Sequence, residues 1–349
     1  MSTLLEKMLS SGSAKNTAVL SASSFFNVKD TIPTDLPILN VAFSGSVDGG
    51  LLPGLTVIAG VSKTFKSMLS LYSMKAYLDK YPDAIALFYD SEFGITPEYI
   101  AGFQIDIDRV VHIPITDVEE LKFDIVQKLK EIGKKDKVFI LIDSLGNLAS
   151  KKEMDDAEEE KSVGDMSRAK AIKSLFRIIT PSLTTKNIPC IVVNHVYMTM
   201  EKYARAIVSG GQGVIYSANT IFVITKAQEK EGTEVVGWNF TINIEKSRYV
   251  KEKSKLTFKV LYDGFIQKYS SLFDLALEAG FLVKPKVGWY NKVNQETGEL
   301  SEQSYRKGDL ENNAEYFDEL MKNETFKEFV ENKFKLGSLN TENPVDSEE

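Results

Sequence analysis

The stretch from Gly60 to Ser67 constrains the fold more than any other part of this chain, because it has the pattern of a phosphate-binding loop. The apolar run 55–59 before it predicts a buried strand, and residues 67–74 after it predict a helix. A G-x-x-x-x-G-K-[ST] loop requires this order of strand, loop and helix. One position departs from the pattern, because Phe65 stands in place of the second glycine.

The loop predicts a nucleotide site. In loops of this kind, backbone N–H groups and the helix N-terminus bind phosphate oxygens. We expect Lys66 to reach the β- and γ-phosphates of ATP, and the Ser67 hydroxyl to ligate Mg²⁺. The residues expected to bind ATP are Gly60, Val61, Ser62, Lys63, Thr64, Phe65, Lys66 and Ser67. Taken alone, the pattern also fits a tight turn that carries a surface lysine.

The rest of the chain predicts an α/β fold. Between about residues 36 and 270, apolar runs of strand length alternate with helical patterns such as 119–132 and 166–184, which is typical of a mostly parallel central sheet. The predicted strands are 55–59, 85–89, 138–142, 190–193, 221–225, 240–244 and 256–260. The first four lack alternation, as strands covered on both faces do. The last three have no helices between them, which predicts an antiparallel part.

Four segments are expected along the chain. They are an N-terminal helical arm (1–35), the α/β core (36–270), a small C-terminal α+β unit (271–337) and a disordered acidic tail (338–349). Within the C-terminal unit we expect helices over 273–279 and 312–335 and a turn at 296–299.

Composition narrows the class of protein. The net charge of −7 argues against a surface that coats DNA everywhere, but it is compatible with a local basic groove. We expect neither a transmembrane helix nor a signal peptide. The single cysteine, Cys190, lies in an apolar run, excludes a disulfide framework and predicts a reducing compartment.

Acidic residues follow the ends of two predicted strands. Strand 138–142 ends at Asp143, which we expect to hold the water shell of Mg²⁺. A turn-capping aspartate is the alternative. Strand 85–89 leads to Asp90 and Glu92. Because hydrolysis of ATP needs a group that orients or deprotonates water, Glu92 is the candidate, with Asp90 as its competitor.

Three further side chains fit a nucleotide site. Tyr99 offers a flat face for adenine, although ordinary packing explains it when it is taken alone. Strand 190–193 leads to Asn194 and His195, which could sense the γ-phosphate and transmit its presence to the following loop.

That following loop is the candidate for nucleic-acid contact. Lys202, Tyr203 and Arg205 combine positive charge with an aromatic ring, which suits the backbone and bases of single-stranded DNA. Gly210 and Gly211 would let the loop rearrange. A plain mobile loop is the alternative.

In this order, the motifs resemble RecA-type strand-exchange recombinases, and within that family the branch of T-even-like bacteriophages, which also carries phenylalanine at the position of Phe65. The likeness covers nearly the whole chain and implies a RecA-like P-loop ATPase core. Its segments are Ser62–Ser67, Phe88–Thr96, Asp143–Glu153, Thr185–Cys190, Glu245–Lys255, Val283–Lys286 and Gly288–Tyr290. We expect the Phe65 side chain to point into the neighbouring core, and the loop to hold phosphate without backbone freedom at this position.

The resemblance implies roles for individual residues. Glu92 corresponds to the glutamate that activates water, Tyr99 to the adenine-stacking tyrosine and Asp143 to the Walker B acid. His195 stands where RecA has a γ-phosphate-sensing glutamine, so the resemblance implies the same task with a different side chain.

Contacts between subunits and with DNA are implied as well. Lys246 and Arg248 stand where RecA has two lysines that reach the ATP of the neighbouring subunit, whereas the sequence alone favours a solvated strand end. The two DNA-binding loops of the family correspond to about 151–165 and 197–211. Because the first is acidic, we assign DNA contact mainly to the second.

The implied function is an ATP-dependent recombinase that forms helical filaments on single-stranded DNA for recombination, replication and repair. The implied cofactors are ATP and Mg²⁺. The implied partners are single- and double-stranded DNA, further copies of the chain docked through the arm at Phe25 and Phe26, a phage single-strand-binding protein and a recombination mediator. The implied location is the cytoplasm of the infected host, with no membrane partner. A hexameric RecA-fold motor and a non-catalytic DNA-binding mediator are the alternatives.

Overall fold

The computed structural model describes residues 3–13, 17–22, 30–159, 167–199, 206–262 and 266–337. The chain divides into two compact units, residues 1–30 and 31–349. Within the first unit, the described elements are helix α1 (Thr3–Ser10) and a 3-10 turn at Leu20–Ala22, and Leu4 and Leu5 are exposed. Phe25 and Phe26 lie outside the described residues.

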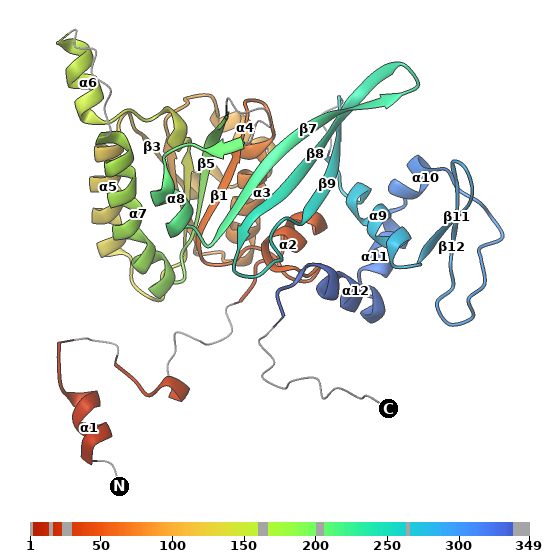
Figure 1. Ribbon diagram of the computed structural model, residues 1–349, viewed down its shortest axis with the longest axis horizontal. Coiled ribbons are helices and arrows are strands. Elements are labelled where there is room, and N and C mark those ends of the chain that lie inside the picture. Colours follow the sequence, from red (N-terminus) through yellow and green to blue (C-terminus); the bar gives the residue numbers. More distant parts are fainter. Residues whose placement is uncertain are drawn as a thin grey trace. The chain divides into compact units, whose positions relative to one another are not determined.

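A ten-stranded sheet forms the centre of the larger unit (Figure 1). Its strands are β1 (Gly54–Gly60), β2 (Ile85–Asp90), β3 (Val110–Pro114), β4 (Val138–Asp143), β5 (Pro189–Met198), β6 (Ala206–Val208), β7 (Thr220–Glu231), β8 (Glu234–Ser247), β9 (Lys255–Leu261) and β10 (Ile266–Gln267). The order is β10-β9-β8-β7-β1-β5-β4-β2-β3, with β6 paired to β5. All neighbours from β7 to β3 run parallel, whereas β7 to β10 form an antiparallel part. The predicted α/β fold is therefore confirmed.

Helices cover both faces of this sheet. The helices in this part of the chain are α2 (Pro37–Ser44), α3 (Lys66–Lys80), α4 (Pro97–Gly102), α5 (Val118–Glu131), α6 (Lys151–Glu158), α7 (Ser167–Thr185) and α8 (Gln212–Ser217), with 3-10 turns at Ile107–Arg109 and Leu145–Asn147. Helix α6 projects away from the sheet and buries none of its residues (Figure 1). Strand β4 shows why the apolar runs lack alternation. Phe139 and Leu141 join one core with α3, whereas Ile140 and Ile142 join the other with α5 and α7. Both faces are buried, so both need apolar side chains.

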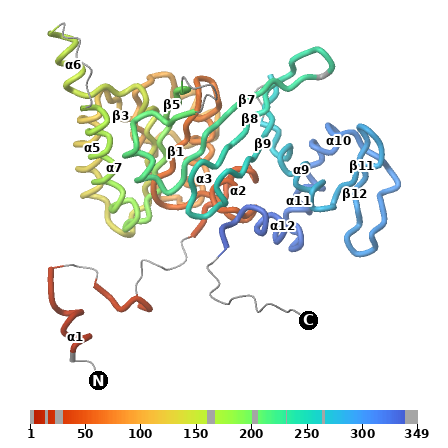
Figure 2. Tube along the Cα trace, viewed as in Figure 1, coloured from red at the N-terminus to blue at the C-terminus, as the bar shows by residue number. Residues whose placement is uncertain are grey.

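The C-terminal part of the larger unit contains a hairpin and four helices. They are α9 (Ser270–Glu278), β11 (Leu282–Lys286), β12 (Trp289–Lys292), α10 (Lys307–Glu311), α11 (Ala314–Leu320) and α12 (Glu324–Phe334). An ion-pair cluster links these elements to the sheet, because the Nζ of Lys259 on β9 lies 3.0 Å from Glu229 on β7 and 2.9 Å from Glu311 on α10. In Figure 2 the β7–β8 hairpin extends beyond the neighbouring strands.

Several details differ from the sequence predictions. Strand β3 was not predicted, because it is a short edge strand with mostly exposed side chains and ends in Pro114. The predicted helix 312–335 is two helices, since Asn323 caps the start of α12. The segment expected as the first DNA-binding loop begins as α6, where Ser150 and Glu153 form a capping box, a pattern that indicates the start of a helix.

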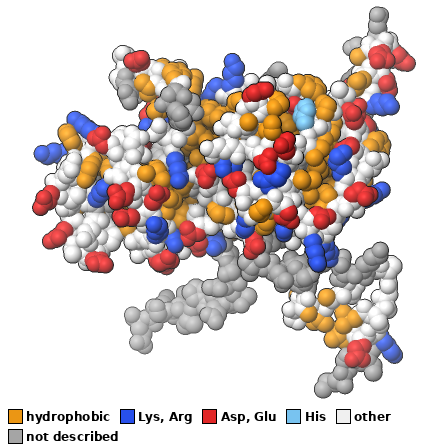
Figure 3. Space-filling model, turned by 180° about the vertical axis from the view of Figure 1, so that it is seen from behind, with side chains coloured by type: hydrophobic (Ala, Val, Ile, Leu, Met, Phe, Trp, Pro, Cys, Tyr) orange, Lys and Arg blue, Asp and Glu red, His pale blue; other side chains and the backbone are white. Residues whose placement is uncertain are grey.

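Charge is distributed evenly on the face shown in Figure 3, where acidic and basic side chains are interspersed. No helix in the described ranges is long and apolar enough to cross a bilayer.

Candidate nucleotide-binding site

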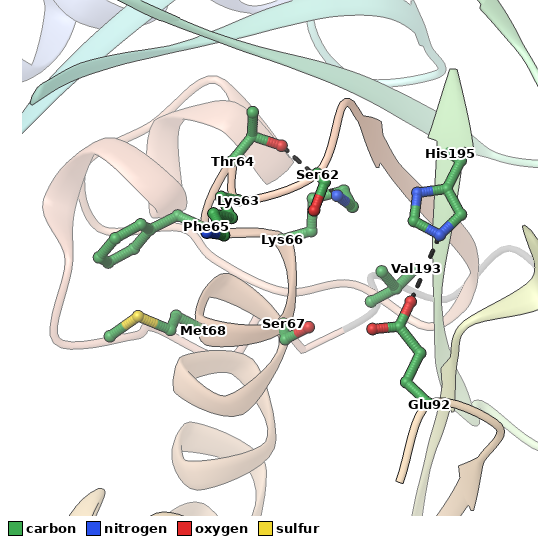
Figure 4. A pocket seen from close by; sticks show the side chains of 10 residues that line it. All are labelled: Ser62, Lys63, Thr64, Phe65, Lys66, Ser67, Met68, Glu92, Val193 and His195. Carbon is green, nitrogen blue, oxygen red and sulfur yellow. Dashed lines mark hydrogen bonds and ion pairs between the residues drawn. The ribbon is translucent and has the colours of Figure 1, made fainter. Parts of the chain in front are cut away.

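The loop predicted to bind phosphate connects the end of β1 to the start of α3, as expected. It closes on itself, because Thr64 Oγ1 and Lys66 Nζ each donate a hydrogen bond to the carbonyl of Val61 at 2.8 Å. A cavity lies beside it, and the lining brings several of the predicted site residues together (Figure 4). The cavity is lined by Ser62, Lys63, Thr64, Phe65, Lys66, Ser67, Met68, Glu92, Val193 and His195.

Phe65 has a backbone conformation that is typical of glycine, and its side chain packs against the hydrophobic core. Its φ of 63° and ψ of 16° lie in the left-handed region, so the expectation that the loop needs no such freedom here is wrong. Its ring packs 4.7 Å from the ring centroid of Phe240 and 6.5 Å from that of Phe258. The prediction that the side chain points into the neighbouring core is therefore confirmed, and Figure 4 shows it directed away from Lys66 and Ser62.

Asp143 ends β4 as a buried carboxylate that is only 2% exposed, and neither of its oxygens has a hydrogen-bond partner among the described residues. Burial raises the pKa of Asp143 to about 6; the nearby Ser67 hydroxyl opposes this shift, whereas Glu92 and Asp90 reinforce it. A buried carboxylate without a partner is costly unless a cation or donor satisfies it. Oxygen ligands of this kind suit the hydrated shell of Mg²⁺, so Asp143 and Ser67 fit the predicted metal.

Replacing Asp143 with asparagine is expected to stabilise the ligand-free protein at pH 7. The pKa of the carboxyl is higher in the folded chain than its ordinary value of 3.8. The free energy of unfolding therefore falls as the pH rises from about 4 to about 6. The ionised group then costs roughly 2–3 kcal/mol, of which asparagine would recover about half because its amide is also buried. Thermal unfolding between pH 4 and 8 measures this, with the exposed Asp83→Asn as control. An unchanged pH slope in Asp143→Asn would contradict the assignment.

Glu92 and His195 meet across the cavity. His195 Nε2 lies 3.3 Å from Glu92 Oε1 and 3.5 Å from Ser144 Oγ. The ring lies against Gly146, where a Cβ would be 2.3 Å from the His195 Cδ2 atom, so only glycine leaves room for it. The side chain of the competitor Asp90 is buried and does not line this cavity. Its carboxylate accepts the backbone N–H groups of Glu92 and the next residue and lies 3.1 Å from His112.

The end of β5 connects this cavity to the second predicted DNA-binding loop. Asn194 Nδ2 donates to the carbonyl of Ser209 at 2.8 Å, and the N–H of Ser209 donates to the carbonyl of His195 at 2.9 Å. Ser209 directly precedes Gly210 and Gly211, which both have positive φ. The other predicted DNA-contact residues, Lys202, Tyr203 and Arg205, lie outside the described residues.

Several residues predicted for the nucleotide site are not among those that line the cavity: Gly60, Val61 and Asp143, and also Tyr99, Lys246 and Arg248. Tyr99 lies in the first turn of α4, is 44% exposed, and its ring centroid lies 5.6 Å from that of Phe103. Lys246, near the end of β8, donates to two carbonyls in the last turn of α8, those of Ile215 at 2.7 Å and Tyr216 at 3.3 Å. Arg248 is exposed.

One residue in contact with the loop was missed. Lys226 on β7 donates from Nζ to the carbonyl of Lys63 at 3.1 Å. A lysine 163 positions later in the chain carries no local signal that would predict this contact.

Comparison with known proteins agrees with this geometry. Residues 6–267 match the RecA N-terminal domain, three quarters of the chain. The chain belongs to the RecA family. Residues 269–330 match the C-terminal domain of the bacteriophage T4 recombination and repair protein.

Individual relatives place this RecA-type recombinase in the phage branch. The chain is 47% identical to the recombination and repair protein of Enterobacteria phage T4 (UvsX), covering 100% of this chain and 90% of the relative. It is 26% identical to protein RecA of Streptomyces avermitilis, over 78% of this chain and 71% of the relative. Protein RecA of Frankia alni is 25% identical, with 78% and 76% covered. The predicted resemblance to T-even-like phage recombinases is thus confirmed.

Proposed function

We propose that this RecA-type recombinase is a DNA-dependent ATPase that exchanges DNA strands as a helical filament on single-stranded DNA. The observation that carries the proposal is that one cavity is lined by the phosphate loop, Glu92 and His195, while the carboxylate of Asp143, at the end of the adjoining β4, has no partner among the described residues. Family membership supports it, because RecA-type proteins act on DNA and form filaments.

The cofactors we propose are ATP and Mg²⁺. ATP would supply the phosphoryl group, and Mg²⁺ would neutralise its charge. Lys66 and the backbone N–H groups of the loop would hold the phosphates. The Ser67 hydroxyl would ligate the metal, and the Asp143 carboxylate would hold its water shell. Glu92 would orient the attacking water and accept its proton, and it is suited to this because its side chain lies in the cavity whereas that of Asp90 is engaged in a turn.

We propose that His195 senses whether the γ-phosphate is bound. The hydrogen bonds around Ser209 would transmit this change to the second predicted DNA-binding loop. Lys202, Tyr203, Arg205, Gly210 and Gly211 would contact single-stranded DNA there. A change at the His195 side chain would move the carbonyl that accepts from Ser209. Nucleotide binding and DNA binding would then favour the same loop conformation.

Assembly would complete the site. Lys246 and Arg248 would reach the ATP of the neighbouring subunit, and Tyr99 would stack on adenine. The arm, residues 1–35, would dock on the next core (36–270), for which β3 offers an unpaired sheet edge beside an apolar pocket lined by Phe88, Ile95, Pro97, Ile100, Ile107, Asp108, Val110 and His112. Contacts that do not close into a ring give a helical filament.

The C-terminal unit (271–337) and the acidic tail (338–349) complete the proposed division of the chain. We also propose a phage single-strand-binding protein and a recombination mediator as partners. The cytoplasm of the infected host is the proposed location, because the 47% identical relative belongs to a bacteriophage.

The test is the ATPase rate with and without single-stranded DNA at rising salt. We expect hydrolysis to depend on DNA, and the stimulation to disappear between about 50 and 200 mM salt, since phosphate contacts release counterions. Electron microscopy of the same samples should show filaments on DNA. Rings would favour a hexameric motor, and absence of turnover with DNA would favour a non-catalytic mediator; either result would overturn the proposal.

A further inference from the structure

The phosphate loop contains two residues whose backbone is unusual for their type. Lys63 has a φ of 59° and Phe65 a φ of 63°, both in the left-handed region. Side chains with a Cβ rarely adopt this region, because the Cβ approaches the carbonyl oxygen. Such a conformation persists only where the surroundings hold it in place. The question is therefore what holds each of these two residues.

Phe65 is held by its own side chain. Its ring packs against Phe240 on β8 and Phe258 on β9, so the antiparallel part of the sheet fixes this end of the loop. Lys63 is exposed, and no ring in the described part of the chain is recorded against its side chain. Its carbonyl, however, accepts the hydrogen bond from Lys226 Nζ at 3.1 Å.

Lys226 is restrained in turn by an aromatic face. Its Nζ lies 4.7 Å from the ring centroid of Trp238 on β8, which is the geometry of a cation–π contact. Lys226 itself is exposed, and a free lysine side chain would sample many rotamers. The indole face limits these, so the ammonium stays where it can donate to the loop.

The hydrogen bond from Lys226 to the Lys63 carbonyl also sets the direction of the Thr64 N–H group. In a trans peptide the carbonyl of one residue and the N–H of the next point to opposite sides. Because the Lys63 carbonyl points to Lys226, the N–H of Thr64 is turned to the opposite side of that peptide. Thr64 lines the cavity, and backbone N–H groups are what such loops use to bind phosphate.

The charge of Lys226 is felt inside the cavity as well. Burial is the main cause that lowers the pKa of the Lys66 ammonium, and Lys226 acts in the same direction, while Glu92 and Asp143 oppose them. Lys226 is therefore near enough to add to the positive potential at the phosphate site.

We propose that Lys226, held by Trp238, is a positioning residue for the nucleotide phosphates: it fixes the Lys63 carbonyl and thereby aims the Thr64 N–H into the phosphate site. This rests on the proposed nucleotide function of the loop. The antiparallel strands thus hold the loop at two points, through Lys226 and through the ring of Phe65. A second glycine in place of Phe65 would have no side chain for these strands to hold.

The experiment compares Lys226→Met with Lys226→Arg. Methionine keeps the length and apolar stem but cannot donate, whereas arginine can donate to the carbonyl and stack on the indole. We expect Lys226→Met to raise the KM for ATP and the Kd for a fluorescent ATP analogue about tenfold, the usual size of one hydrogen bond, with kcat within about twofold. Lys226→Arg should restore most of the affinity. Lys137→Met is the matched control, because Lys137 lies 4.7 Å over the ring of Tyr81 and does not line the cavity.

Trp238 supplies a second readout that a merely structural effect would not change. The chain has two tryptophans, so in a Trp289→Phe background Trp238 is the sole reporter. Its fluorescence should change when the nucleotide binds, and this change should be lost in Lys226→Met. A Trp238→Phe variant, which keeps a weaker aromatic face, should raise KM by about threefold.

The outcomes separate this inference from the proposed function. If Lys226→Met binds nucleotide as wild type does while Lys66→Ala fails to bind, the inference is overturned and the proposed function stands. A fall in kcat at unchanged KM would also overturn it, because Lys226 would then act in the chemical step. If the wild-type protein binds no ATP, the proposed function fails first. Should Lys226→Met unfold, Trp238→Phe decides, and an unchanged KM in that variant overturns the inference.

Discussion

Replacing Lys66 with alanine is expected to weaken ATP binding by about a hundredfold or more and to abolish DNA-stimulated hydrolysis with it. Lys66 is 7% exposed, and its Nζ donates a hydrogen bond to the carbonyl of Val61 in the same loop. Burial lowers the pKa of Lys66, so its charge is held at a cost that phosphate oxygens would offset. No other lining side chain combines this burial with a fixed positive charge, since Lys63 is exposed.

The measurement is a titration with a fluorescent ATP analogue, followed by the ATPase rate on single-stranded DNA. Lys66→Arg tests geometry at constant charge, and we expect it to fail as well, because the wide guanidinium does not replace a compact ammonium in a closed loop. The exposed Lys130→Ala on α5 is the control for loss of a lysine elsewhere. Thermal unfolding must show that Lys66→Ala is folded. Normal hydrolysis by a folded Lys66→Ala would show that the site is wrongly assigned.

The fold was predictable where burial dictates the sequence locally. The run Val138–Asp143 has no alternation because its side chains enter two cores, one on each face of the sheet. The same reasoning located β1, β2 and the start of β5. It missed β3, since an exposed edge strand needs few apolar residues. It also placed the end of β5 too early, because the strand continues to Met198 by pairing with β6 rather than by burial.

The site was predictable where parallel strands end together. Gly60, Asp90, Asp143 and His195 are the ends or near-ends of β1, β2, β4 and β5, and the register pairs Asp90 with Asp143 and Gly60 with His195. Contacts between side chains were not predictable in this way. Lys226 lies on β7 in the long β7–β8 hairpin and contacts the phosphate loop from there. The pairing of His195 with Glu92 depends on side-chain rotamers, which no motif specifies.

Replacing Glu92 with glutamine is expected to lower kcat for ATP hydrolysis by about 10²–10⁴-fold while nucleotide binding changes by less than about threefold. Glutamine has the size of glutamate and can still contact His195, whose Nε2 lies 3.3 Å from the carboxylate. It cannot accept a proton from water. The backbone turn should survive, because the N–H of residue 92 bonds to the Asp90 carboxylate whichever side chain it carries.

This variant separates binding from hydrolysis within the assembly. If bound ATP stabilises the filament and hydrolysis releases it, Glu92→Gln should form filaments on single-stranded DNA that persist when free ATP is removed, whereas wild-type filaments should dissociate. Single-turnover hydrolysis and electron microscopy of the same sample provide the two readouts. Asp90→Asn is the informative comparison, since the carboxylate of Asp90 is 2% exposed and bonded to the turn, so its loss should lower thermal stability more than kcat. Should Asp90→Asn lose hydrolysis while Glu92→Gln retains it, the two carboxylates would have to exchange roles, and the water would be activated from the β2 strand end rather than from the cavity wall.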